Sequence, residues 1–191
     1  MPAPIGHNFI AGGRSAAGEV ILQSLDASTG EALPYCFHQA TEAEVDAAAR
    51  AAEAAYPAYR ALSPERRAQF LDAIAEQIDA LGDDFVQLVC RETALPAARI
   101  QGERGRTSGQ MRLFAKVLRR GDFLGARIDR ALPERQPLPR PDLRQYRTGV
   151  GPVAVFGASN FPLAFSTAGG DTAAALAAGC PVVFKAHSGH M

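Results

Sequence analysis

The segment from Gly151 to Lys185 restricts the possible folds of this chain more than any other stretch. Two short apolar runs, Val153–Phe156 and Pro181–Phe184, the second ending in Lys185, stand near its ends, and alanine-rich sequence closed by Gly179 lies between them. Short strands without polar residues are typical of a parallel sheet that is covered on both faces. A strand, a helix and a second strand within so short a stretch predict a βαβ unit with a right-handed crossover, and therefore an α/β fold.

The helix of this unit is expected to begin soon after the first strand. Residues 157–159 have the composition of a tight turn, and Asn160 after them is a favourable N-cap. Pro162 stands where the first helical turn would be, a position that proline tolerates. The sequence therefore predicts one helix from about Asn160 to Ala178.

The first 120 residues predict short strands followed by four helices. Apolar pairs among glycine and serine indicate strands within the first 40 residues. Thr41 and Glu44 have the spacing of a capping box, Ser63 caps a second helix, Asp83 opens a third, and a fourth is expected over about 96–118. The side chains expected to face inward are Phe70, Ile74, Ile78 and Leu81 on the second helix, and Ile100, Thr107, Met111, Phe114 and Leu118 on the fourth.

Residues 121–149 differ from the sequence on either side. Apolar and charged residues alternate there, and Pro133, Pro137, Pro139 and Pro141 exclude a central strand. We expect an extended excursion that meets another subunit or domain. The predicted organisation is thus 1–120 (strands and helices), 121–149 (extended arm) and 150–191 (first βαβ unit).

Composition excludes several classes of function. Lys and Arg together number 20, as do Asp and Glu, so the net charge predicts neither a nucleic-acid nor a membrane partner. The N-terminus lacks a basic region followed by an apolar core, and we expect a cytoplasmic protein. The three cysteines, Cys36, Cys90 and Cys180, are too scattered for a disulfide framework or a zinc site, and no metal is predicted.

Basic residues nevertheless gather in one helix. Residues 99–120 contain seven basic residues and one acidic residue, whereas residues 41–92 contain eleven acidic and five basic residues. The basic helix could bind an anionic partner, or it could be a solvated face beside an acidic segment.

Two polar residues follow the predicted strands, where ligands bind in open parallel sheets. Asn160 comes after the first strand, and its amide could donate to a developing oxyanion or merely cap a helix. Lys185 ends the second strand, and its ammonium could reach a nucleotide ribose or phosphate or merely be solvated. No G-x-G-x-x-G follows the first strand, so spacing alone indicates an α/β domain in which nucleotide binding stays one hypothesis.

The residues themselves carry a resemblance. Gly151–Leu163 is similar to the G-P-V-x-x-I-x-P-W-N-F-P-L segment of the aldehyde dehydrogenase superfamily, and Ala174–Lys185 is similar to its A-L-A-A-G-N-x-V-V-x-K segment. Glu92–Ala94 stands where the family often has E-T/S-G. The form Phe156–Pro162 resembles most the branch that oxidises 2-oxoglutarate semialdehyde (2,5-dioxopentanoate).

The resemblance implies a fold and a set of roles. The fold would be the N-terminal part of the aldehyde dehydrogenase fold, with an incomplete Rossmann-like cofactor domain and residues 121–149 as an oligomerisation arm of a homodimer or homotetramer. Asn160 would help to hold the oxyanion that forms from the aldehyde substrate, and Lys185 would bind the adenosine ribose of NADP or NAD. Cofactor-binding residues would be Phe156, Gly157, Ala158, Ser159, Lys185, His187 and Ser188. Ser188 replaces a glutamate that many NAD-preferring members carry, so NADP should be accepted.

The family's nucleophilic cysteine, its general-base glutamate and its G-S-T-x-x-G turn lie beyond the segment that this chain resembles. None of Cys36, Cys90 and Cys180 has the nucleophile's context. We therefore expect this chain alone to have no dehydrogenase activity, although its family oxidises aldehydes to acids with NAD(P). The alternative is a non-catalytic binding or assembly module from a truncated or split aldehyde dehydrogenase.

Overall fold

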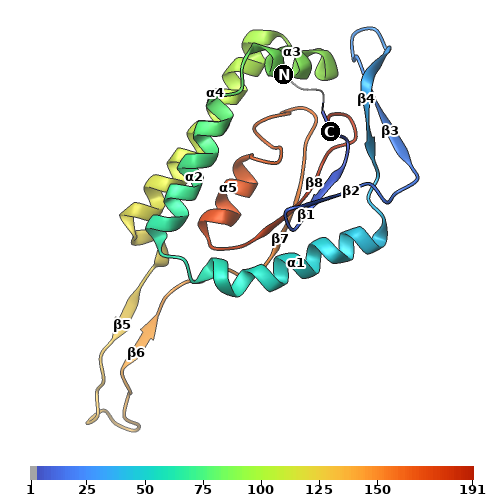
Figure 1. Ribbon diagram of the computed structural model, residues 1–191. Helices are drawn as coiled ribbons and strands as arrows, with labels where there is room; N and C mark the ends of the chain where they lie inside the picture. The colour runs from blue at the N-terminus through green and yellow to red at the C-terminus, as the bar shows by residue number, and fades with distance from the viewer. Residues whose placement is uncertain (1–3) are drawn as a thin grey trace.

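The computed structural model describes residues 4–191, so residues 1–3 of the predicted N-terminal region lie outside it. Two antiparallel hairpins come first, β1 (Asn8–Ile10) with β2 (Gly13–Ser15) and β3 (Ile21–Leu25) with β4 (Ala32–His38). Four helices follow, namely α1 (Glu42–Arg60), α2 (Pro64–Asp79), α3 (Asp83–Thr93) and α4 (Ala97–Arg120). The predicted order of short strands and four helices is confirmed (Figure 1).

The capping box is present at the start of α1, and it also ties the helix to the N-terminal strands. Glu44 Oε2 accepts hydrogen bonds from the Thr41 backbone N–H at 2.8 Å and from the Thr41 hydroxyl at 3.0 Å. Glu44 Oε1 accepts from the Ala17 backbone N–H at 3.3 Å. Hydrogen bonds from Ser15, then from Thr41, lower the pKa of Glu44 from 4.5 to about 2.

This shift predicts an acid-dependent contribution to stability. Because the folded-state pKa of Glu44 lies below its unfolded value, the stabilisation is fully present above pH 4.5 and is lost as the pH falls toward about 2. Glu44→Gln should therefore lower the urea midpoint at neutral pH, and the difference from the parent chain should shrink as the pH falls through this window. Glu42→Gln, on the exposed side of the same first turn, serves as the control. A difference that does not vary with pH would contradict this assignment.

The main core lies where α2, α4 and α5 (Gly170–Ala177) meet. It contains Ala68, Leu71 and Ala75 of α2, Met111, Ala115 and Leu118 of α4, and Ala173 and Ala177 of α5. Figure 1 shows α2 and α4 side by side, with α5 between this pair and the strands β7 and β8. The inward residues predicted for α4 are confirmed, since all are buried except Phe114, which is partly buried against the core.

The predicted inward stripe of α2 is wrong in part. Phe70 is 45% exposed and stacks edge-on against Tyr59, whereas Leu71 is fully buried. The large apolar residues suggested a stripe through Phe70, but Ala68 and Ala75 take the central places because small side chains allow the helices to approach closely.

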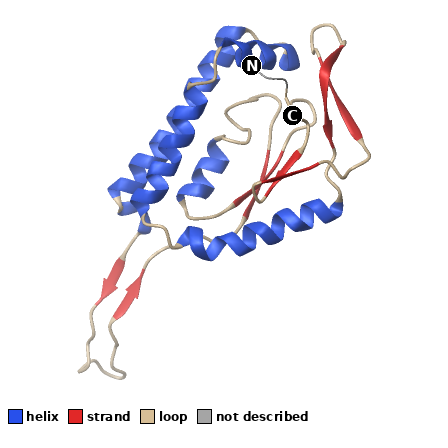
Figure 2. Cartoon of the chain, viewed as in Figure 1, coloured by secondary structure: helices blue, strands red, loops and turns tan. Residues whose placement is uncertain are grey.

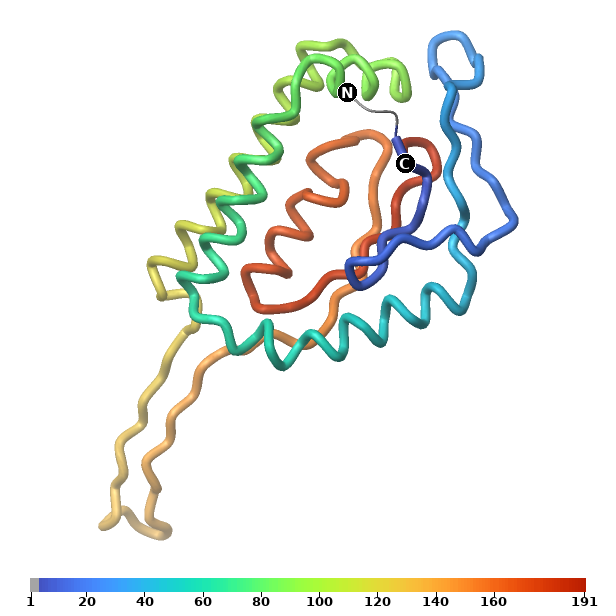
Figure 3. Tube along the Cα trace, viewed as in Figure 1, coloured from blue at the N-terminus to red at the C-terminus, as the bar shows by residue number. Residues whose placement is uncertain are grey.

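Residues 122–145 leave the body of the molecule. A short 3-10 helix, η1 (Asp122–Leu124), precedes the antiparallel hairpin of β5 (Arg127–Asp129) and β6 (Leu143–Gln145). The tube in Figure 3 shows this hairpin projecting away from the helices and the other strands. The four prolines lie between the two strands, where none of them interrupts the ladder.

The βαβ unit closes the described chain. β7 (Val153–Phe156) and β8 (Val182–Lys185) pair in parallel, with Val153 opposite Val182 and Phe156 opposite Lys185, as predicted. The predicted helix start at Asn160 is wrong, because residues 157–169 are irregular and α5 begins at Gly170. Gly169 and Gly170 stand at the true start, and a Cβ at Gly169 would lie 2.6 Å from the Ala164 carbonyl oxygen.

The strand β7 is covered unevenly by the rest of the described chain. Val155 is buried, whereas Phe156 is 69% exposed and Val150 is 91% exposed. α5 packs on both strands and α1 also contacts β8 (Figure 2), but the exposed Phe156 shows that the described residues do not cover β7 on both faces as expected. Among residues 4–191, no helix combines the length and the apolar character needed to cross a membrane.

Candidate functional site

The parallel register brings the two predicted site segments to one edge of the sheet. Phe156 and Lys185 are paired as the last residues of β7 and β8, and the Gly157 backbone N–H donates to the Lys185 carbonyl at 3.0 Å. The loop 157–169 leaves from the first strand and the segment 186–191 from the second. Polar groups of both segments therefore gather beyond the carboxyl ends of the strands, where ligands of parallel sheets bind.

Close packing between these segments depends on a glycine. A Cβ at Gly157 would lie 2.9 Å from the ring of Phe184 and 3.2 Å from the backbone nitrogen of His187. Both distances are shorter than ordinary van der Waals contact, so a side chain at residue 157 would push the loop away from β8. The absence of a side chain at residue 157 thus lets the loop after β7 and the segment after β8 lie against each other.

Asn160 lies in the exposed part of the loop. Its backbone carbonyl accepts a hydrogen bond from Arg99 Nη2 at 3.1 Å. Within residues 4–191 its side-chain amide has no hydrogen-bond partner, so that this group is available to a ligand rather than serving as a helix cap. The cap reading of Asn160 is wrong, and the donor reading is compatible with its position.

The other predicted site residues fall into two groups. Lys185, Ser159 and Ser188 are exposed, as is Phe156. Gly157, Ala158 and His187 are partly buried and line a cavity of about 260 Å³ between the strand ends and the helices. The structure thus places all of them around one end of β7 and β8 but does not direct all of them into one cavity.

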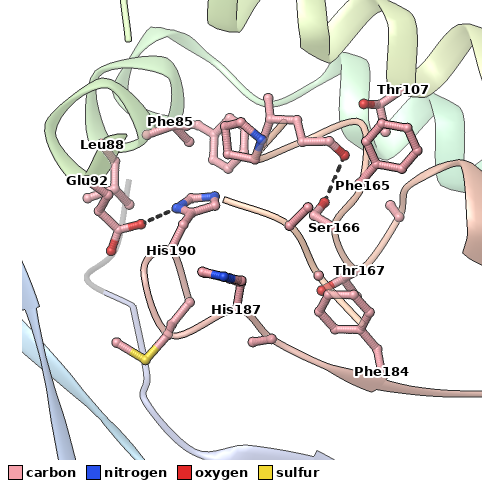
Figure 4. A pocket seen from close by; sticks show the side chains of 18 of the residues that line it. Phe85, Leu88, Glu92, Thr107, Phe165, Ser166, Thr167, Phe184, His187 and His190 are labelled. Carbon is pink, nitrogen blue, oxygen red and sulfur yellow. Dashed lines mark hydrogen bonds and ion pairs between the residues drawn. The ribbon is translucent and has the colours of Figure 1, made fainter. Parts of the chain in front are cut away.

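Figure 4 shows that aromatic side chains form part of the mainly apolar wall of this cavity, with a polar group at one side. Phe85, Phe165 and Phe184 come from three different elements. His190 Nδ1 lies 2.6 Å from Glu92 Oε2, and Ser24 Oγ donates to Glu92 Oε1 at 2.6 Å. Apolar walls with a few convergent polar groups are typical of small-molecule sites.

The pair of Glu92 and His190 was not foreseen from the sequence. Glu92 is buried at the end of α3, and its charge has a further effect on a neighbouring tyrosine. Burial, with the negative charge of Glu92 as the next cause, raises the pKa of Tyr35 to about 12, so this phenol is neutral at physiological pH. The available signal was the helical spacing of Glu92 with the apolar Val86 and Val89, because a carboxylate on a buried face requires partners.

A second buried carboxylate, Glu103, supports the loop after β7. Glu103 lies on the inward face of α4 and is 4% exposed. Its Oε2 accepts hydrogen bonds from the backbone N–H groups of Leu163 at 3.1 Å and Ala164 at 3.3 Å. The Leu163 amide would be a free donor of the first helical turn if the helix began at Asn160, and here it is satisfied by a side chain instead.

Comparisons with known proteins agree with this geometry. The model of the family described as "Aldehyde dehydrogenase family" matches residues 15–190. The alpha-ketoglutaric semialdehyde dehydrogenase of Acinetobacter baylyi is 62% identical over 186 residues, which are 97% of this chain and 35% of that protein. The alpha-ketoglutaric semialdehyde dehydrogenase 2 of Azospirillum brasilense is 55% identical, over 96% of this chain and 35% of that protein.

Solved structures give the same result for the fold. The succinate-semialdehyde dehydrogenase from Burkholderia pseudomallei superposes with a TM-score of 0.81 at 27% identity, covering 99% of this chain and 38% of that one. Aldehyde dehydrogenase 21 from Physcomitrella patens superposes with a TM-score of 0.83 at 24% identity, covering 96% and 37%. The chain therefore spans a little over a third of the length of the proteins it matches.

Proposed function

This chain belongs to the aldehyde dehydrogenase family, and from that premise we propose that it supplies the cofactor-binding start of an enzyme that oxidises 2-oxoglutarate semialdehyde to its carboxylic acid with NAD(P). The sequence-based assignment to the family, to the N-terminal part of its fold and to the 2-oxoglutarate (alpha-ketoglutaric) semialdehyde branch is confirmed. The activity, the substrate and the partners of the whole protein are proposals.

One observation carries the proposed function. The in-register ends of β7 and β8 bring Lys185 next to the start of the loop that presents the Asn160 amide, which has no hydrogen-bond partner within residues 4–191. In the proposed reaction the Asn160 amide N–H donates to the substrate oxygen as it becomes negatively charged, which stabilises that oxyanion relative to the uncharged aldehyde.

The donor groups at this edge fit a nicotinamide dinucleotide. The Lys185 ammonium and the hydroxyls of Ser159 and Ser188 are exposed, and they suit the hydroxyls and phosphates of a nucleotide. We assign Phe156, Gly157, Ala158 and His187 to the same cofactor edge. The bound cofactor would supply the electron acceptor for the oxidation.

A chimera tests the proposal. It joins residues 1–190 of this chain to the part of the Acinetobacter baylyi enzyme that follows the matched segment, and formation of the reduced cofactor is measured with 2-oxoglutarate semialdehyde. We expect turnover by the chimera and none by the 191-residue chain. The three cysteines of this chain lie in β4, in α3 and just before β8, and none of them lines the cavity beyond the strand ends. A folded chimera without turnover would exclude the activity, and turnover by the chain alone would refute its predicted inactivity.

The cofactor preference is proposed to depend on Ser188. A glutamate at this exposed position would repel the 2′-phosphate of NADP, whereas serine does not. Two unit charges about 4 Å apart in water repel by about 1 kcal/mol, or roughly fivefold in affinity. Ser188→Glu in the chimera should therefore raise KM for NADP at least about fivefold relative to NAD, and Ser188→Gln, which adds the same bulk without charge, should not. Equal effects of the two substitutions would argue against an electrostatic role.

We further propose that the hairpin of residues 121–149 pairs with a neighbouring subunit. Its apolar side chains Ile128, Leu138, Leu143 and Tyr146 are each 50% or more exposed, although they belong to residue types that are usually covered. Sedimentation of the chimera with and without residues 126–147 tests this assignment. An unchanged mass after deletion would exclude it.

A further inference from the structure

One face of α4 holds the loop that carries Asn160. Arg99, Glu103 and Arg106 are spaced four and three residues apart, so their side chains project from the same side of the helix. All three contact residues of the loop 160–165. The contact joins α4 to the loop that follows β7.

The polar part of this contact is a continuous chain of bonds. Arg99 Nε donates to Glu103 Oε1 at 3.1 Å, and Arg99 Nη2 donates to the Asn160 carbonyl at 3.1 Å. Glu103 Oε2 accepts the N–H groups of Leu163 and Ala164. One ion pair therefore fixes the backbone on both sides of Phe161.

Contacts between guanidinium groups and aromatic rings also hold the loop against α4. The Arg99 guanidinium lies 4.9 Å from the centre of the Phe161 ring, and the Arg106 guanidinium lies 5.4 Å from it. Arg106 also lies 5.5 Å from the ring of Phe165, which meets Phe161 edge to face. Guanidinium groups at such distances attract the faces of aromatic rings. The loop is thus held through its side chains as well as its backbone.

Asn160 itself has no side-chain bond that would set its position within the described chain. The location of its amide must therefore follow from the backbone, and the backbone around it is fixed by Arg99 and Glu103. Removing the Glu103 carboxylate would leave the N–H groups of Leu163 and Ala164, which are bonded in a buried environment, without acceptors. A buried unpaired amide is costly, so the loop would move to satisfy these donors.

We propose that Glu103 is a positioning residue of the oxidation, which acts through Asn160 by holding the loop after β7 against α4. This inference rests on the proposed function of Asn160. Displacing a catalytic group by about 1 Å can lower a rate about 100-fold, and the same scale is expected when Glu103 is removed.

Kinetics of the chimera test the proposal, with Glu103→Ala, Glu103→Gln and Asn160→Ala as the variants. Glu103→Ala should lower kcat about 100-fold and leave KM for the cofactor nearly unchanged. Glu103→Gln keeps a carbonyl oxygen for the two amides and should recover most of the rate. Gln101→Ala, on the exposed side of the same turn of α4, is the matched control and should retain the parent rate.

The decisive measurement is the double variant. If Glu103 acts through Asn160, Glu103→Ala should lower kcat less than about threefold when Asn160 is already alanine, because the group it positions is gone. An equal fall in both backgrounds would refute the proposal. A parent chimera without turnover would instead refute the proposed function, so the two failures are distinguishable.

Hydrogen exchange in the 191-residue chain provides a test that does not need activity. The Leu163 and Ala164 amides should be protected in the parent chain and in Glu103→Gln, and at least tenfold less protected in Glu103→Ala. Unchanged protection in Glu103→Ala, or loss of protection at every amide of the chain, would overturn the assignment of a local anchor.

Discussion

Asn160→Ala is expected to lower kcat of the chimera about 10²- to 10³-fold, because that is the usual loss when one donor to a developing oxyanion is removed. The effect should fall on kcat rather than on KM for the cofactor, since the amide interacts with charge that develops only during the reaction. Stability should hardly change, because the side chain is exposed and unbonded within the described chain.

The measurement is steady-state kinetics with the semialdehyde, accompanied by circular dichroism to show that the variant is folded. Gln101→Ala again provides the control, because it removes an amide side chain from an exposed position outside the site. A folded Asn160→Ala enzyme with a kcat within threefold of the parent would eliminate Asn160 as an oxyanion donor.

Leu71→Ala should be among the most destabilising single substitutions in the chain. Leu71 is fully buried in the core shared by α2, α4 and α5, and truncating such a leucine costs about 2–5 kcal/mol through lost burial and the remaining cavity. The lower end of this range is expected only if Ala68 and its neighbours can move into the space. Urea unfolding of the 191-residue chain, followed by circular dichroism, measures the loss.

Leu113→Ala is the matched control for this substitution. The substitution removes the same atoms from α4, but Leu113 is 50% exposed. We therefore expect the free energy of unfolding to fall by less than about 1 kcal/mol. Equal losses for the two leucines would mean that the contact of α2 with α4 is not the stabilising core of this chain.

Local sequence signals predicted the starts of α1 and α2 and both parallel strands. Thr41, Ser63 and Pro64 act within one turn of the helices they begin, and the strands β7 and β8 are short runs of apolar residues. These features depend on neighbouring residues alone, so a single sequence suffices to locate them.

The two wrong predictions, the helix start at Asn160 and the core stripe of α2, were caused by contacts between distant parts of the chain. The helix was expected to begin at Asn160 because a cap and a proline stand there, but Glu103, about 60 positions earlier, accepts the hydrogen bond of the Leu163 amide that a helix start would leave free. The core stripe of α2 was misplaced because alanines on facing helices, not the largest side chains, determine the closest approach. Both the contact of Glu103 with the loop and the close approach of the helices depend on residues far apart in the sequence, so no local pattern predicts them.

The site was predicted in outline only. Sequence position placed Asn160 and Lys185 at the ends of two parallel strands, and the resemblance supplied their roles. The sequence analysis did not assign a role to Glu103, although the sequence contained a signal for one. Glu103 stands between Ile100 and Thr107, which lie on the inward-facing stripe of α4. A carboxylate on such a stripe predicts a buried partner, even when the partner cannot be identified.

The shared core has a consequence for how the chain acquires its fold during synthesis. Ala173 and Ala177 of α5 complete the core between α2 and α4. These two helices therefore emerge from the ribosome before the alanines that complete their shared core. Until residue 177 is available, Leu71, Met111 and Leu118 lack part of their covering, and the nascent chain presents an apolar surface to chaperones. The helices α2 and α4 are therefore expected to fold stably only after α5 has been synthesised and the βαβ unit has docked on them.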